Sequence, residues 1–331
     1  MNSETTIDSP DHLIVPFAAS SADGWAQAMQ DLPPKSLPNL KKLLRGMTLA
    51  NTNPGDARAL STPHERVLAA DFGLNQSNGA EAAMDGLIPW AAFEAQAPVG
   101  QAWAIVTPCH WAMGREHATL TDPAALNLPT AQSHALMAAM QPYFETEGIT
   151  LHHHAPGHWL AEGEVFRRLP TASLDRVLGR NVDAWLPDST TAPSLRRLQN
   201  EMQMLLYTHP LNDERAAARQ MTVNSFWLSG TGALSAAAPP VNTTVSMPRQ
   251  LAQAAFTDDW AAYRAAWQAL DAGAVATLLA RQAAGQTVRL TLCGERNAQT
   301  FETAAGGFLA KIGRFSGLLA RWSPYSLLSM L

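Results

Sequence analysis

Short continuous apolar runs along this chain predict strands. Each is four to eight residues long, is rich in branched or aromatic side chains, and is bounded by turn-forming residues. The runs are His12–Phe17 (HLIVPF), 101–108 (QAWAIVTP), Val223–Leu228 (VNSFWL) and 287–293 (TVRLTLC). We also expect a strand at 148–154 (GITLHHH). Cys109 to Leu120 (CHWAMGREHATL) indicates a hairpin partner of the strand before it.

Other segments carry apolar residues at helical spacing. Leucines at 37, 40, 43 and 44 form one face, and positions 195, 198, 202, 205 and 206 form another. Thr62, Pro63 and Glu65 have the spacing of a capped helix start. Helices are therefore predicted near 37–44, from 63 onward, and at 130–147, 195–207, 257–270, 272–283 and 304–322.

The alternation of these strands and helices predicts an α/β protein with a mixed sheet flanked by helices. We expect residues 1–11 to be a disordered tail and residues 12–232 to form the main α/β domain. Residues 233–248 (ALSAAAPPVNTTVSMP) are small, proline-bearing and weakly patterned, which indicates a linker or surface loop. Residues 249–331 are expected to be a C-terminal α/β portion packed on the same domain.

Composition narrows the function. Of 331 residues, 47% are hydrophobic and 15% are charged, and the formal net charge is −5. A general nucleic-acid binder would carry a basic excess, so nucleic acid is not an expected partner. No apolar run reaches the ~18–20 residues of a membrane span, so no membrane partner is expected. Two cysteines without a CxxC pair, and no apolar leader, favour a cytoplasmic protein.

The segment Leu195–Gly232 combines polar and apolar residues in an unusual mixture. Arg215 could clamp an anion through two nitrogens, and Asn212 or Asp213 could cap the helix that carries it. The structural alternative is that Asn212 is only a cap, Trp227 is core and the sequence SGTG is a tight turn. The candidate ligand-binding residues of this segment are His209, Asn212, Arg215, Asn224, Trp227, Ser229, Gly230 and Gly232.

A second group of charged and amide side chains surrounds Gly179. Asp175, Arg180 and Asn181 belong to it, and arginines beside glycine turns suit contacts with anions. These residues could face the same site as Arg215. Alternatively, they form surface ion pairs around a helix end, which contribute little.

Histidines are the only candidate metal ligands that share a spacing. On a strand, His152 and His154 lie on one face, and His158 follows shortly after. No carboxylate pattern completes the set, so ordinary histidines on an aromatic-rich strand are the alternative. We expect no metal or other cofactor; if a divalent metal such as Mn or Zn is bound, the ligands are His152, His154, His158 and His209.

The segment from about 205 to 232 resembles archaeal-type cofactor-independent phosphoglycerate mutases. An Asn, an Arg shortly after it, a second Asn, an apolar-Trp run and Gly-x-Gly carry the resemblance, and here they are Asn212, Arg215, Asn224, Trp227, Gly230 and Gly232. Residues 12–295 resemble a proteobacterial family of phosphoglycerate mutase-like, or Rpf-cluster regulatory, proteins. The matching pieces are DGLIPW, TPCHW, PTASLDRVLGRNVDAWLP, RRLQNEMQMLLYTHPLN, VNSFWLSGTG and LTLCGER.

The mutase resemblance implies an alkaline-phosphatase-like fold, here in reduced form, with two divalent metals, a serine phosphoacceptor and an arginine-lined phosphate site. The first strand lacks the expected Asp-Gly, and no serine stands in a phosphoacceptor motif. No histidine follows His209, so the C-terminal third lacks the expected metal cluster.

We therefore expect a metal-free, phosphoglycerate mutase-like regulatory protein. Its partner would be a small anionic or phosphorylated metabolite, or a protein. Two alternatives stay open. One is an active metal-dependent mutase or phosphotransferase. The other is a structural protein-interaction module, which the ten tryptophans favour.

Overall fold

The computed structural model describes most of the chain and divides it into two compact units. The described residues are 11–33, 35–74, 84–188, 190, 192–237, 244–304 and 323–331. Unit 1 comprises residues 1–57, 63–71 and 240–331, and unit 2 comprises residues 58–62 and 72–239. Residues 1–10 of the expected tail (1–11), residues 238–243 of the expected linker and residues 305–322 of the expected helix (304–322) lie outside the described residues.

Unit 1 is built on a five-stranded mixed sheet with the order β2-β11-β10-β1-β9. β1 runs parallel to β10 and β9, whereas β11 is antiparallel to β10 and β2. The strands are β1 (His12–Val15), β2 (Met47–Asn53), β9 (Val245–Ser246), β10 (Arg289–Cys293) and β11 (Ala298–Thr303). The helices are α1 (Asp23–Gln30), α2 (Pro38–Arg45), α3 (Pro63–Asp71), α9 (Gln250–Phe256), α10 (Trp260–Leu270), α11 (Ala276–Ala283) and α13 (Pro324–Leu328), with a π-helical turn at Asp271–Val275.

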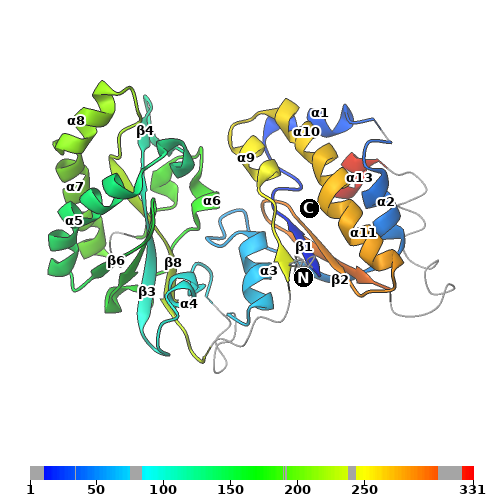
Figure 1. Ribbon diagram of the computed structural model, residues 1–331, viewed down its shortest axis with the longest axis horizontal. Coiled ribbons are helices and arrows are strands. Elements are labelled where there is room, and N and C mark those ends of the chain that lie inside the picture. Colours follow the sequence, from blue (N-terminus) through cyan, green and yellow to red (C-terminus); the bar gives the residue numbers. More distant parts are fainter. Residues whose placement is uncertain are drawn as a thin grey trace, which may run out of the picture. The chain divides into compact units, whose positions relative to one another are not determined.

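Helices cover both faces of this sheet (Figure 1). Leu13 and Val15 belong to the large core that also contains buried residues of α1, α2, α10 and α11. Ile14 points to the opposite face, where it clusters with Val67 of α3. Side chains alternate along a strand, so a strand covered on both faces is apolar throughout, which explains the unbroken run that predicted β1.

Unit 2 is built on a four-stranded sheet with the order β6-β7-β3-β8 and a separate two-stranded hairpin, β4-β5. All of its strand pairs are antiparallel. The strands are β3 (Ala102–Cys109), β4 (Trp111–Met113), β5 (Ala118–Leu120), β6 (Thr150–Ala155), β7 (His158–Glu162) and β8 (Ser225–Ala233). The α-helices are α4 (Trp90–Glu94), α5 (Thr130–Thr146), α6 (Leu174–Val177), α7 (Pro193–Tyr207) and α8 (Pro210–Ala217); 3₁₀ turns span Pro123–Leu126, Glu164–Phe166 and Val182–Ala184.

The core of unit 2 lies between its sheet and two long helices. Ala104 and Val106 of β3 share one cluster with Met140 of α5 and with Leu198 and Met202 of α7. The apolar stripe that predicted α7 is therefore the face that packs on the sheet. Its opposite face, which includes Asn200 and Tyr207, is exposed.

The SGTG sequence lies inside β8, where the sequence predicted a closing turn. Between the pairs Trp103–Gly232 and Ile105–Ser229, Ala104 alone opposes two residues of β8. Gly230 has a φ of +60°, which is the left-handed geometry that a bulge of this kind requires. The glycine thus allows β8 to continue past the point where the pattern suggested an end.

The α/β class with a mixed sheet flanked by helices is confirmed, since unit 1 has such a sheet, while the sheet of unit 2 is antiparallel. The division into units differs from the expected domains, because β1 pairs with β9 and β10 and so belongs with residues 240–331. Strands that are so far apart in the sequence can pair without any local sequence pattern that indicates it. The reduced alkaline-phosphatase-like topology stays a prediction. Over the described residues, the helices are all too short or too polar to cross a membrane.

Candidate functional site

Arg215, the expected anion clamp, lies on α8 and is only 1% exposed. Its Nε donates to the Met221 carbonyl oxygen at 2.8 Å, and Nη2 donates to the Leu126 carbonyl oxygen at 2.6 Å. Nη1 donates to Oε1 of Gln132 on α5. Burial lowers the pKa of the guanidinium. These contacts join α8 to segments that precede it and follow it in the sequence. The guanidinium is therefore not open to a ligand in the described geometry. Anion binding by Arg215 stays a prediction.

Asn212 is also held by the backbone. Its Nδ2 donates to the carbonyl oxygens of Leu206 and Val223, both at 2.7 Å, and its Oδ1 accepts from the Val223 N–H at 2.9 Å. The predicted role of Asn212 or Asp213 as helix cap is wrong. His209 is the cap, because its Nδ1 accepts from the Leu211 N–H at 3.2 Å. Asn212 instead fixes the end of α7 to the residues that precede β8.

The candidates on β8 are embedded in the sheet. Trp227 is 1% exposed, and its Nε1 donates to the Ala172 carbonyl oxygen at 2.9 Å. Ser229 is buried, and Gly230 and Gly232 both have positive φ. The conformation of Gly230 belongs to the bulge, so the structure gives this glycine a backbone role.

The second candidate group surrounds α6 and the turn after it. Asp175 is buried and Arg180 is half-buried. Asn181 accepts through Oδ1 from the Asp183 N–H at 2.9 Å and forms a β-bridge with Thr119. This turn therefore lies against β5, and Asp183 lines a groove beside the β4-β5 hairpin.

The candidate metal-binding histidines do not converge. The His152 ring lies tilted against the Trp103 ring, with centroids 5.1 Å apart, and the His154 and His158 ring centroids lie 5.4 Å apart. His158 Nε2 contacts Glu94 Oε2 at 2.6 Å, and His209 caps α8. Within the described ranges, no cluster of three or more His, Cys, Asp or Glu side chains could hold a metal ion. The expectation that no metal is bound, with these histidines as the ligands if one is, stays a prediction.

A groove of about 510 Å³ lies between α7 and the β4-β5 hairpin. Of the candidate ligand-binding residues that the sequence predicted in Leu195–Gly232, Asn224 alone lines this groove. The other polar or aromatic side chains lining it are Trp111, Arg115, Glu116, His117, Asp183, Arg196, Gln199, Asn200, Gln203 and Tyr207. A volume of this size is within the range of ligand sites.

Arg196 is the half-buried cation of the groove. Its neighbour Arg197 pairs with Glu147 and lies 3.8 Å from Glu201, outside the groove lining. Arg196 has no ion-pair partner among the described residues. What separates Arg196 from Arg197 is its proximity to the hairpin formed by residues 111–120, which no local sequence pattern reveals.

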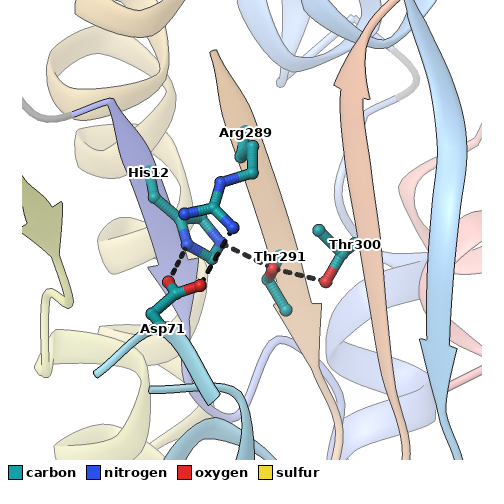
Figure 2. A network of polar contacts seen from close by, with 5 residues as sticks. All are labelled: His12, Asp71, Arg289, Thr291 and Thr300. Atoms are coloured by element: carbon teal, nitrogen blue, oxygen red, sulfur yellow. Dashed lines mark hydrogen bonds and ion pairs between the residues drawn. The ribbon is translucent and has the colours of Figure 1, made fainter. Parts of the chain in front are cut away.

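Unit 1 contains a buried polar network that the sequence did not predict (Figure 2). His12 Nδ1 contacts Asp71 Oδ2 at 2.5 Å, and His12 Nε2 contacts the Thr291 hydroxyl at 2.7 Å. Arg289 donates to the other Asp71 oxygen at 2.9 Å, and Thr291 contacts Thr300 at 2.8 Å. Despite burial, the contacts with His12 and Arg289 lower the pKa of Asp71.

The order carboxylate–imidazole–hydroxyl is that of a nucleophile relay. However, His12 and Thr291 are both 0% exposed, so no substrate reaches the hydroxyl in this structure. The network instead ties α3 to the first residues of β1 and β10. The sequence feature that could have indicated this network is His12, a histidine at the start of an apolar run.

Comparisons with known proteins add a global resemblance. No protein-family model matches the chain, and no curated protein matches it. The chain is similar along its length to solved α/β structures of low sequence identity. One is the cofactor-independent phosphoglycerate mutase from Thermoplasma acidophilum DSM 1728, at 12% identity, covering 97% of this chain and 98% of that chain with a TM-score of 0.34. Another is the PH0037 protein from Pyrococcus horikoshii, at 11% identity, covering 92% of each chain with a TM-score of 0.43. Both TM-scores are below 0.5, so no residue role is transferred from these structures.

Proposed function

We propose that this chain is a phosphoglycerate mutase-like regulatory protein that binds an anionic group in the groove beside α7. The assignment to the proteobacterial phosphoglycerate mutase-like, or Rpf-cluster regulatory, proteins rests on the sequence motifs given above. The observation that carries the binding proposal is Arg196, a half-buried guanidinium that lines a 510 Å³ groove and has no ion pair among the described residues.

The groove strengthens the attraction of Arg196 for an anion. Trp111, which is buried in the wall of the groove, reduces the exposure of a bound group to water, which strengthens an electrostatic contact. A charge-assisted hydrogen bond contributes about 1.5–3 kcal/mol. Asn200 lines the same groove and is exposed, so its amide can add a neutral hydrogen bond. A carboxylate or phosphate is the chemistry that this combination recognises.

Two-metal phosphoryl transfer is the less favoured function because it requires several fixed carboxylate and imidazole ligands. The candidate histidines are distributed over β6, β7 and the start of α8, where they contact other protein groups. We expect a cytoplasmic protein without a bound metal, whose partner is a small anionic or phosphorylated metabolite or another protein.

The test is a calorimetric titration with 3-phosphoglycerate and with inorganic phosphate. We expect Arg196→Gln to weaken binding by about tenfold or more, since loss of one charge-assisted contact exceeds 1.4 kcal/mol. Arg197→Gln is the matched control, because Arg197 is adjacent on α7 but contacts Glu147. Equal binding by both variants would refute the assignment of Arg196.

A parallel measurement addresses the enzyme alternative. Metal content would be determined by elemental analysis, and mutase activity would be assayed with and without added Mn²⁺. Stoichiometric Mn or Zn together with mutase activity would overturn the regulatory proposal and direct attention to the histidines.

A further inference from the structure

One edge of the β4 strand faces the groove and, among the described residues, has no neighbouring strand. β3 pairs with β8 as far as Cys109–Ser225, and the Asn224 N–H then donates to the Cys109 carbonyl oxygen at 3.1 Å. Beyond this point the side chain of Asn224 replaces the strand. Its Oδ1 accepts from the Trp111 N–H at 2.7 Å, and its Nδ2 donates to the Trp111 carbonyl oxygen at 3.0 Å. The amide thus imitates one peptide unit of a continued β8.

The direction of the next backbone groups follows from strand alternation. On the β4 side of the hairpin, the even-numbered residues bond to the β5 side. The Thr121 N–H donates to the His110 carbonyl oxygen, and the Gly114 N–H donates to the His117 carbonyl oxygen. In an antiparallel pair, successive residues direct their N–H and C=O groups to opposite sides. Met113 therefore directs both groups to the same side as Trp111, into the groove that both residues line.

The opposite wall is long enough for an extended segment. The lining residues of α7 run from Arg196 to Tyr207, a length of about 16 Å at 1.5 Å per residue. An extended chain of about five residues covers that length. The hairpin residue Met113 is 80% exposed and Tyr207 is 82% exposed, so apolar surface is available to a partner's side chains.

We infer that the groove binds an extended peptide segment of a partner protein, which adds as a strand to β4 and directs one acidic side chain to Arg196. This inference rests on the proposed function, because Arg196 supplies the contact with the anion. Main-chain hydrogen bonds to a free strand edge provide affinity, and side-chain contacts provide specificity. Glu116 and Asp183 line the same groove, so the expected segment has one acidic residue among neutral or basic ones.

In the experiment, peptides that bind the intact protein are selected from a displayed library of random sequences. The best binder is then synthesised with free backbone amides and in versions that carry a single N-methyl group at each position. We expect one acidic residue in the selected sequences and a tenfold or larger loss of affinity from N-methylation at one position only, that of the residue whose N–H donates to the Met113 carbonyl oxygen, because Asn224 already bonds both backbone groups of Trp111. Amide hydrogen exchange at Met113 should slow when the peptide is bound, and Arg196→Gln should weaken binding while Arg197→Gln should not.

The outcomes separate the two proposals. A selected peptide that binds without slowing exchange at Met113 overturns strand addition. Absence of any enriched peptide, together with phosphate binding that depends on Arg196, overturns strand addition and leaves the proposed function intact. Protection of Met113 with unchanged affinity in Arg196→Gln supports strand addition and refutes the role of Arg196 in the proposed function.

Discussion

Replacing Arg215 by alanine distinguishes a structural role from a binding role. The guanidinium has three protein acceptors, the carbonyl oxygens of Met221 and Leu126 and Oε1 of Gln132. Removing it leaves the buried Leu126 carbonyl oxygen unsatisfied, at about 1–3 kcal/mol, and opens space where a long side chain was buried. Bonds to charged groups contribute about 1.5–3 kcal/mol each, but they are not additive here because water can reach Gln132. We expect a loss of about 3–5 kcal/mol of unfolding free energy.

The assay is urea denaturation followed by far-UV circular dichroism, with Arg197→Ala as the control. Arg197 is 64% exposed and forms surface ion pairs, which water screens, so its removal should change the free energy of unfolding little. Phosphate titration of the folded Arg215→Ala protein completes the test. A variant as stable as the parent that no longer binds phosphate would refute this reasoning and establish Arg215 as the anion clamp.

Two further predictions concern other parts of the chain. Asp71 has a lowered pKa in the folded protein, so its contacts stabilise the fold above the unfolded carboxyl pKa, near 4, and this contribution is lost as pH falls through the folded value. Asp71→Asn should therefore lower stability at pH 7 by about 3 kcal/mol, since His12 and Arg289 lose their partner, and should flatten the acid side of the stability profile; an unchanged profile below pH 4 would contradict this. In Gly230→Ala, the new Cβ would lie 2.9 Å from Ile105 Cδ1 at a φ of +60°, so we expect a loss of about 1–3 kcal/mol in the same denaturation assay, with unchanged phosphate binding. Lost binding without lost stability would instead indicate that Gly230 approaches a ligand.

Local patterns predicted the elements well, and they failed where distant segments meet. The runs at β1, β3 and β10, and the stripe of α7, are present near the expected boundaries because burial on one or two faces imposes those periods. The same rule does not show which strands are neighbours. The unit to which β1 belongs was consequently not predicted.

The candidate site shows the same limit at the level of single residues. Arg196 and Arg197 are adjacent in sequence, yet one lines the groove and the other pairs with Glu147. The residues around Arg215 in the sequence are of the types found in anion sites. In the structure, however, two of the acceptors of its guanidinium lie far away in sequence, on the turn ending at Leu126 and on α5. Whether an arginine is available to bind a ligand depends on such distant acceptors, and they cannot be identified from a single sequence.

The positions that carry the mutase resemblance have a structural explanation in this chain. Asn212 joins the end of α7 to Val223, and Asn224 joins the end of β8 to Trp111. Gly230 permits the bulge in β8. Each of these residues is needed because a particular backbone geometry requires it, whichever reaction or ligand the protein serves. These residues can therefore be retained for structural reasons alone. In this chain the scaffold also holds α7 beside the free edge of β4, so the parts that resemble an enzyme position the surface on which we propose that a partner binds.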